Sequence, residues 1–358
     1  MDHIVIMAGG KGERFWPRST KALPKQFQRI VSDRTMIQET FNRVYPEYDK
    51  EHISVVLGES LVPCLQEQLP ILERRSIIVE PIGRNTAAAI GLAAVHIKKE
   101  DPEAVMIVLT ADHVIKPKAA FLAVLEAASD IARKGHIVTF GIIPERAATE
   151  YGYIELGKKL EKSHGLGVFI VKKFTEKPDE KTARSFVQSG YYLWNSGMFA
   201  FRVQDMLNAM EQHMPALYSS LKAIGESIGR KDEDKVKRNQ FESIENISID
   251  YGIMERVSNI ACIKTNFYWD DIGSWSSIAR HRKQEKEGNI TEGNVVVIDS
   301  KNNIVLGDRE EVISIIGVHD LVIVKQDNKL LICNKSSDQN IKEALKLMSQ
   351  DRKLSRYL

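Results

Sequence analysis

Residues 4–17 read IVIMAGGKGERFWP, an apolar run followed at once by a glycine-rich loop. The run at residues 4–7 has the length and composition of a buried strand. Backbone N–H groups of a glycine-rich loop behind such a strand can surround phosphate oxygens, because glycine lets an anion approach closely. Arg14 can bind phosphate with two N–H groups, and Lys25 adds a second cation. The stretch therefore predicts a phosphate-binding loop that PKQF at residues 24–27 closes.

The loop does not match the common nucleotide motifs. Neither the P-loop pattern nor G-x-G-x-x-G is present in this stretch. A tight surface turn with two scattered cations would use the same residues. Pro17 and Pro24 favour a shaped binding surface instead, because they stiffen a long loop at two points.

Composition limits the classes of protein that fit. A chain of 358 residues with 43% apolar residues exceeds one ordinary core, so two domains are expected. The 50 Lys and Arg nearly balance the 48 Asp and Glu, which argues against a nucleic-acid or membrane binder. Cys64, Cys262 and Cys333 lie far apart and indicate free thiols in a reducing compartment. With no leader and no membrane-length apolar run, we expect a cytoplasmic protein.

Strand patterns and helix patterns alternate in the first half of the chain. Expected strands cover residues 53–58, 76–80, 105–109 and 137–141, and expected helices cover 36–44, 61–69, 85–99 and 121–134. This alternation predicts a parallel, doubly wound sheet. Ligands of such sheets bind beyond the carboxyl ends of the strands, where the Gly9–Gly10 loop, Glu80 and Asp112 fall.

The pattern changes after residue 150. Residues 151–154 and 168–174 are expected to form paired strands, and the charged stretch 230–238 a solvated loop. Lys177, in Glu-Lys-Pro, is either a surface ion-pair partner or a second phosphate-binding cation. Asn195, in a predicted tight Asn-Ser-Gly turn, is either a turn former or an amide that binds a hydroxyl group.

Apolar residues recur every nine positions near the end of the chain, at Val295, Ile304, Ile313, Val322 and Leu331. This repeat predicts five short strands, arranged as a small β-helix or a meander, and a helix at 341–348 follows. A structural or oligomerisation module is the simplest interpretation.

Two carboxylates are candidate metal ligands. Asp112 ends an apolar strand, and Asp271 follows another. Together they could hold a Mg²⁺ ion that keeps water and phosphate ligands, although each alone could equally be a cap or a turn acid. His113, beside Asp112, is interpreted as a structural neighbour.

Eight motifs follow one another along the chain in the same order as in a known family, which the chain resembles. They are the opening loop, EPxxRNTA at 80–87, ADH at 111–113, EYGYI at 150–154, FxEKP at 174–178, WNSGMF at 194–199, SIDY at 248–251 and WxDIGSW at 269–275. Over residues 3–280 the chain is similar to the bacterial mannose-1-phosphate guanylyltransferases, members of the sugar-phosphate nucleotidyltransferases.

The resemblance implies an α/β fold: a Rossmann-like, mixed but mainly parallel sheet flanked by helices, with a small C-terminal, left-handed β-helix-like domain. Residues 1–285 would be the catalytic domain and 286–358 the β-helix-like domain. The implied reaction converts GTP and α-D-mannose 1-phosphate into GDP-mannose and pyrophosphate with Mg²⁺. No nucleic acid or membrane is expected as a partner. A homodimer is expected, with the C-terminal domain as a candidate interface.

The resemblance also implies residue roles. Arg14, Lys25, Asp112 and Asp271 would be catalytic, and the two aspartates would hold the metal. The nucleotide would be bound by Ala8, Gly9, Gly10, Gly12, Arg14, Lys25, Glu80, Asn85, Thr86 and Asp112. The sugar phosphate would be bound by Gly152, Glu176, Lys177 and Asn195.

The chain departs from the family pattern at two positions. Glu13 stands where a small or hydroxyl residue is usual, so its side chain should point away from the phosphates or pair with a cation. Thr175 replaces an aliphatic residue before Glu-Lys-Pro. Many relatives carry a further C-terminal isomerase domain, and because this chain ends at Leu358 we expect transfer without isomerisation.

The implied reaction needs no general base, because a phosphate monoester with a second pKa of about 6 is already a dianionic nucleophile at neutral pH. Positioning and charge neutralisation should suffice. Two alternatives remain open: the same chemistry with another sugar 1-phosphate or base, and a catalytically silent subunit that senses nucleotide sugars.

Overall fold

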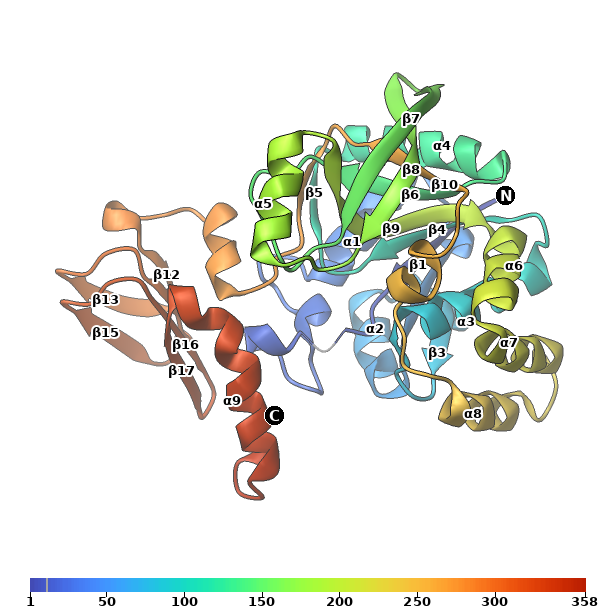
Figure 1. Ribbon diagram of the computed structural model, residues 1–358. Coiled ribbons are helices and arrows are strands. Elements are labelled where there is room, and N and C mark those ends of the chain that lie inside the picture. Colours follow the sequence, from blue (N-terminus) through green and yellow to red (C-terminus); the bar gives the residue numbers. More distant parts are fainter. Residues whose placement is uncertain (11) are drawn as a thin grey trace.

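The computed structural model describes residues 1–10 and 12–358; Lys11, within the predicted loop, lies outside the described residues. A large α/β body is built from the N-terminal part of the chain, and a smaller β-rich part from the C-terminal part lies beside it (Figure 1). The segment of the opening loop lies between the two parts, as Figure 1 shows in dark blue.

A nine-stranded sheet forms the centre of the α/β body, in the order β3-β2-β1-β4-β9-β6-β10-β8-β7. Only β9 and β8 run against the common direction, so the sheet is mixed but mainly parallel, as predicted. The strands are β1 (Asp2–Met7), β2 (Ile53–Gly58), β3 (Ile77–Glu80), β4 (Val105–Thr110), β6 (Ile137–Ile142), β7 (Tyr153–Ser163), β8 (Leu166–Thr175), β9 (Tyr192–Arg202) and β10 (Ile260–Lys264).

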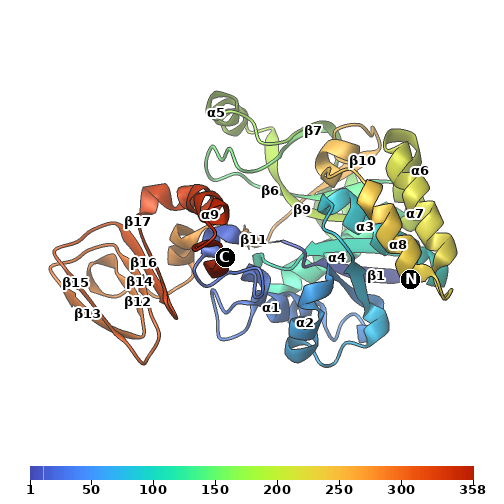
Figure 2. The same ribbon diagram turned by 90° about the horizontal axis from the view of Figure 1, so that it is seen from below.

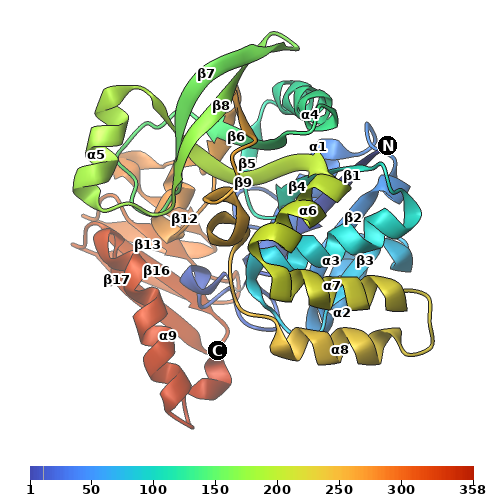
Figure 3. The same cartoon turned by 45° about the vertical axis from the view of Figure 1, so that its right-hand side comes forward.

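Helices cover both faces of this sheet, which explains why its central strands are apolar throughout. In β1, Ile4 and Ile6 pack into the core on one face, and Val5 packs into the core on the other. The first face is covered by α1 (Met36–Val44), α2 (Val62–Gln68) and α4 (Lys118–Arg133). The second is covered by α3 (Asn85–Glu100), α6 (Val203–His213), α7 (Pro215–Ser227) and α8 (Glu233–Ser243), which lie together in Figure 3. The same body also contains α5 (Glu180–Ser189).

Two local predictions are wrong. The charged stretch 230–238 is not a solvated loop, because it leads into α8, whose Phe241 is fully buried and anchors the helix. Asn195 does not lie in a tight turn: it lies within β9, where its backbone N–H donates to the carbonyl oxygen of Gly152 at 2.8 Å. The positive φ of Gly197, +71°, accompanies a register shift between β6 and β9 without ending the strand.

The β-rich part is built from parallel coils. Its strands are β12 (Ile290–Glu292), β13 (Asn294–Ile298), β14 (Ile304–Leu306), β15 (Val312–Ile316), β16 (Leu321–Gln326) and β17 (Lys329–Asn334). Val295 pairs with Ile313 and Ile304 pairs with Val322, so paired residues lie two nine-residue repeats apart. Successive strands therefore alternate between two sheets, which favours the β-helix over the meander (Figure 2). The last strand departs from the coils, because β17 pairs with β16 in antiparallel fashion.

The β-rich part shares a core with the opening loop. Phe15 packs with Trp275, at a ring distance of 4.9 Å, and both belong to a buried cluster with Ile304 and Val322. Ile341, which begins α9 (Ile341–Gln350), joins the same cluster. The predicted boundary between residues 285 and 286 stays a prediction. Among the described residues, no helix combines the length and the hydropathy needed to cross a bilayer.

Candidate active site

The loop after β1 takes a conformation that its sequence requires. Gly12 has a φ of +59°, and a Cβ atom there would lie only 2.4 Å from Cβ of Lys25. Any other residue would therefore strain the backbone and displace Lys25. The buried side chain of Gln26 fixes the same loop, because its amide donates to the carbonyl oxygens of Ala8 at 2.6 Å and Gly10 at 2.9 Å. Gln26 was not predicted as a site residue, although it lies in the quoted PKQF motif.

A cavity of about 260 Å³ opens beside this loop. Five of the predicted residues line it together: Gly12, Arg14, Lys25, Asp112 and Asp271. His113 and Lys342 also line this cavity, and Lys342 comes from α9 in the β-rich part. Residues from the start, the middle and the end of the chain thus converge on one space.

Lys25 joins the two candidate metal ligands. Its buried Nζ donates to Oδ2 of Asp112 at 2.9 Å and to the carbonyl oxygen of Asp271 at 2.7 Å. Burial acts to raise the pKa of Asp112, but Lys25 and His113 outweigh it and hold this pKa below its ordinary value. Asp112 is therefore a carboxylate at neutral pH.

A two-stranded sheet that the sequence did not predict brings Asp271 to Asp112. β11 (Tyr268–Asp270) pairs in antiparallel fashion with β5 (Val114–Lys116), and Asp270 lies opposite Val114. Asp271 follows β11 and Asp112 closely precedes β5, so both aspartates lie at the same end of this small sheet. Strands of three residues give no recognisable periodicity, which is why this pairing was missed.

The neighbouring Asp270 holds the Asp271 segment in place. Its buried carboxylate accepts hydrogen bonds from Arg280 Nε at 2.5 Å, from His281 Nε2 at 2.7 Å and from the backbone N–H of Ile272 at 2.9 Å. Burial opposes ionisation of Asp270, but His281 and Arg280 hold its pKa far below the ordinary value. Ile272 has a φ of +45°, a strained conformation for a β-branched residue. The ion pairs of Asp270 thus fix a strained turn directly after Asp271.

Tyr151, two residues before the start of β7, contacts Asp271. Its hydroxyl donates to Oδ1 of Asp271 at 2.7 Å. Burial and the charge of Asp271 raise the pKa of Tyr151, so its hydroxyl keeps its proton and remains a donor. Tyr151 lies in the quoted EYGYI motif, which gave a predicted role only to Gly152.

His113 is held by its neighbours, in agreement with its interpretation as a structural residue. The indole N–H of Trp269 donates to Nδ1 of His113 at 3.0 Å, and burial lowers the histidine's pKa. His113 is thus neutral and oriented by Trp269.

The donor set suits a divalent cation of the hard type. Asp112 and Asp271 contribute carboxylate oxygens to one cavity, and oxygen is the ligand that Mg²⁺ prefers. The described residues contain no cluster of three or more Asp, Glu, His or Cys side chains that could hold a metal by themselves. A bound ion would therefore need ligands from substrate phosphate and water, which is usual for Mg²⁺.

Glu80 lies at the carboxyl end of β3, against the glycine loop. A Cβ atom on Gly9 would lie 3.3 Å from Oε2 of Glu80, so the small residue leaves room for this carboxyl group. Burial raises the pKa of Glu80 to about 7. Its Oε1 is buried and has no hydrogen-bond partner among the described residues. A ligand that donates a hydrogen bond would satisfy it.

Asn85 and Thr86 start α3, outside the 260 Å³ cavity. Asn85 has a φ of +69°, and its Oδ1 accepts a hydrogen bond from the backbone N–H of Thr86 at 2.9 Å. Oγ1 of Thr86 accepts from the backbone N–H of Ile249 at 2.9 Å. These contacts connect the start of α3 to the SIDY segment.

The four predicted sugar-phosphate residues form a second group around Gly152. A Cβ atom on Gly152 would lie 2.4 Å from Oε2 of Glu176 and 3.4 Å from Cβ of Asn195. Nζ of Lys177 donates to Oε1 of Glu176 at 2.6 Å. The structure therefore brings all four side-chain positions together, and the Tyr151–Asp271 hydrogen bond joins this group to the first.

Asp250 belongs to this second group and was not predicted. The amide of Asn195 donates to its Oδ1 at 3.0 Å. Burial and the nearby charge of Glu176 raise the pKa of Asp250 to about 6. The SIDY motif was a signal for this residue, but the motif alone gave it no role.

Comparison with known proteins decides the family. Residues 3–288 match the model of the nucleotidyl transferase family. The chain belongs to the nucleotidyl transferase family. Residues 293–348 of this nucleotidyl transferase match a second family, described as a MannoseP isomerase/GMP-like beta-helix domain.

Individual relatives agree with this assignment. The nucleotidyl transferase is 38% identical to alginate biosynthesis protein AlgA of Pseudomonas aeruginosa, over 96% of its own chain and 71% of that protein. It is also 38% identical to a mannose-1-phosphate guanylyltransferase of Salmonella muenchen, over 95% and 72% of the two chains. A solved structure from Thermus thermophilus, described as a mannose-1-phosphate geranyltransferase, superposes with a TM-score of 0.87 at 29% identity, over 97% of this chain and 99% of that one.

Proposed function

We propose that this nucleotidyl transferase transfers GMP from GTP to α-D-mannose 1-phosphate, forming GDP-mannose and pyrophosphate. One observation carries the proposal: Arg14, Lys25, Asp112 and Asp271 line a single cavity at the glycine loop. Two cations and two carboxylates in one space suit a phosphoryl group bound with a divalent cation. The choice of mannose and guanine rests on the relatives named above.

The nucleotide would lie along the loop after β1. Backbone groups of Ala8, Gly9, Gly10 and Gly12 would surround its phosphates, with Arg14 and Lys25 as the cations. Glu80, Asn85 and Thr86 would lie toward the ribose and base. The buried Oε1 of Glu80 supports this, because the N–H groups of guanine are suitable donors for it.

Mannose 1-phosphate would occupy the group around Gly152. Lys177 would neutralise its phosphate. Glu176 would accept hydrogen bonds from sugar hydroxyls, and the amide of Asn195 would donate to a sugar hydroxyl. Asp250, bonded to Asn195, would orient that amide. Tyr151 connects this group to Asp271, so the two substrates would meet near Asp271.

None of the described residues that line the cavity is assigned as a general base for the attack. His113 Nδ1 is engaged by Trp269, and the sugar phosphate is already a dianionic nucleophile. The chain's contribution is alignment for in-line attack on the α-phosphate and neutralisation of the departing pyrophosphate by Arg14 and Lys25. Mg²⁺, held by Asp112 and Asp271, would supply further charge neutralisation at the phosphates.

The cytoplasm is the expected location, and a homodimer through the β-rich part is the expected assembly. The exposed face of the β13–β15 sheet carries Val296, Ile298, Val312 and Ile316, each at least 47% exposed. Apolar side chains gathered on one exposed face are typical of an interface. Sedimentation of the full chain with and without Val312→Lys tests this assembly.

Product analysis tests the substrates. The full chain is incubated with each of four nucleoside triphosphates and with mannose, glucose or heptose 1-phosphate, and the nucleotide sugars are separated by chromatography. GDP-mannose should form fastest. Faster formation of another product would assign another substrate pair, and no product with any pair would support the silent sensing subunit.

A further inference from the structure

Helix α9 reaches from the β-rich part to the phosphate-binding loop. Its first residue, Ile341, is buried in the cluster that contains Phe15 and Trp275, which fixes the start of the helix against the loop. The next residue, Lys342, lines the 260 Å³ cavity together with Arg14 and Lys25. The nucleotidyl transferase body thus does not enclose this cavity alone.

Lys342 lies close enough to Arg14 and Lys177 for their positive charges to act on it. Partial desolvation lowers its pKa, and the charges of Arg14 and Lys177 lower it further, while Glu13 acts in the opposite direction. Neither Arg14 nor Lys342 forms an ion pair with a carboxylate anywhere in residues 1–10 and 12–358. Nε of Arg14 is buried and has no partner among these residues. Arg14, Lys25 and Lys342 thus share one cavity wall with the carboxylates of Glu13, Asp112 and Asp271, but in the described part of the chain only Lys25, of the three cations, is paired with one of them.

The position of Lys342 on its helix is a second feature that favours a bound anion. A cation in the first turn of a helix is disfavoured, because the N-terminal end carries a partial positive charge. A bound anion would offset both the missing ion-pair partners of Arg14 and Lys342 and the repulsion between Lys342 and the helix N-terminus. An anion with several charges, bound beside Arg14, would relieve them most.

We propose that Lys342 binds the pyrophosphate portion of the nucleoside triphosphate, so that the β-rich part completes the active site. This inference rests on the proposed function, because it assigns a further binding residue to the same site. The β- and γ-phosphates are the matching partners because Lys342 shares the cavity wall with the phosphate-binding loop. Release of pyrophosphate would then break a contact between the two parts of the chain.

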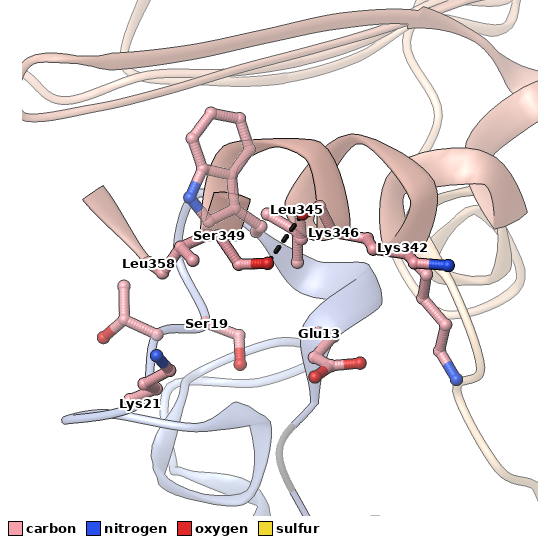
Figure 4. Close-up of a pocket in the computed structure, with 10 residues that line it drawn as sticks. Glu13, Ser19, Lys21, Lys342, Leu345, Lys346, Ser349 and Leu358 are labelled. Carbon is pink, nitrogen blue, oxygen red and sulfur yellow. Dashed lines mark hydrogen bonds between the residues drawn. The ribbon is translucent and has the colours of Figure 1, made fainter. Parts of the chain in front are cut away.

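A neighbouring cavity supplies a matched control. This second cavity, about 320 Å³, lies between α9, the Ser19–Lys21 segment and Leu358, with Glu13 and Lys342 in its wall (Figure 4). In Figure 4, Lys342 lies at the end of this cavity away from Lys21 and Leu358. Lys346, one helical turn after Lys342, lines this second cavity and does not line the first. Replacing Lys346 removes the same charge from the same helix without touching the phosphate cavity.

Calorimetric binding of inorganic pyrophosphate to the full chain with Mg²⁺ tests the proposal without turnover. Lys342→Gln should weaken binding about 10-fold, Lys342→Arg should restore it to within about 3-fold of wild type, and Lys346→Gln should leave it unchanged. Binding of mannose 1-phosphate should be unchanged in all three. Equal pyrophosphate binding by Lys342→Gln and wild type, or equal losses in Lys342→Gln and Lys346→Gln, would overturn the proposal. Lys342 is exposed, so these variants should fold, and their thermal midpoints verify this.

Steady-state kinetics separates this inference from the proposed function. In Lys342→Gln the KM for GTP should rise about 10-fold, while the KM for mannose 1-phosphate stays constant. A change confined to the KM for mannose 1-phosphate would contradict the assignment to pyrophosphate. If wild type bound pyrophosphate through Lys342 but formed no GDP-mannose, the proposed function would fail and the role of Lys342 would stand.

Discussion

Lys25 and Asp112 form a 2.9 Å ion pair inside the cavity, although 87 residues separate them in the chain. The same ammonium group donates to the backbone carbonyl of Asp271. One buried cation thus sets the spacing of the two candidate metal ligands and faces the glycine loop. Its replacement should therefore affect chemistry more than stability.

Lys25→Ala should lower kcat at least about 100-fold, comparable to removing one main electrostatic contact in a preorganised site. The measurement is initial-rate pyrophosphate release at saturating substrates. Lys21→Ala is the matched control, because Lys21 lies in the same loop but is exposed and does not line the 260 Å³ cavity. Wild-type turnover in Lys25→Ala would remove Lys25 from the catalytic residues.

Tyr151→Phe should lower activity about 10- to 100-fold, the usual cost of losing a group that orients a metal ligand. The variant removes the hydrogen bond to Asp271 Oδ1 and leaves the ring packed against Trp194 and Trp269. The half-saturating Mg²⁺ concentration should rise as well, whereas Tyr191→Phe, at an exposed tyrosine, should change neither quantity. An unchanged Mg²⁺ dependence would show that Tyr151 does not position Asp271.

Glu80→Gln should abolish a loss of stability that the wild type shows as pH rises. The pKa of Glu80 is raised to about 7 by burial, so the folded chain keeps a proton that the unfolded chain releases above about pH 4.5. The free energy of unfolding therefore falls between pH 5 and pH 8, by roughly 2–3 kcal/mol for this group. Urea unfolding at both pH values should show Glu80→Gln gaining this amount relative to wild type at pH 8. If the two proteins differed in their free energy of unfolding by the same amount at both pH values, Glu80 would hold no buried proton. The exposed Glu226→Gln variant should show such a constant difference.

Gly152→Ala should raise the KM for mannose 1-phosphate about 10-fold or more and leave the KM for GTP unchanged. The added Cβ would lie 2.4 Å from Oε2 of Glu176, so this carboxylate must move from its place beside Lys177. Gly58→Ala is the control, because a Cβ at Gly58 meets nothing within 4 Å. A rise in the KM for GTP alone would place the sugar phosphate elsewhere.

Much of the α/β body could be predicted from local pattern. Helix 36–44 and strand 53–58 have the predicted bounds, because each is an apolar pattern with clear ends. The Asn-Ser-Gly signal failed at Asn195, since pairing with neighbouring strands outweighs the turn preference of three residues. The nine-residue repeat identified the strands of the β-rich part, but only the pairing shows that two repeats make one coil.

The sequence predicted individual site residues better than the contacts that bring these residues together. Motifs marked Lys25, Asp112 and Asp271, whereas the β5–β11 pairing that brings the aspartates together has no periodic signal. Two orientations of Glu13 were expected, and the structure places this residue in the walls of two neighbouring cavities, where its charge acts on Lys342. Lys342 itself could not be predicted, because it reaches the loop through packing between segments more than 300 residues apart.

The most direct test of the central claim is Mg²⁺-dependent release of pyrophosphate from GTP and mannose 1-phosphate, compared between the wild type and Asp271→Asn. We expect release by the wild type only when both substrates and Mg²⁺ are present, and at least about a 100-fold lower kcat for Asp271→Asn. Release that is independent of mannose 1-phosphate, or equal rates in the two proteins, would contradict a nucleotidyl transfer centred on the Lys25–Asp112–Asp271 cavity.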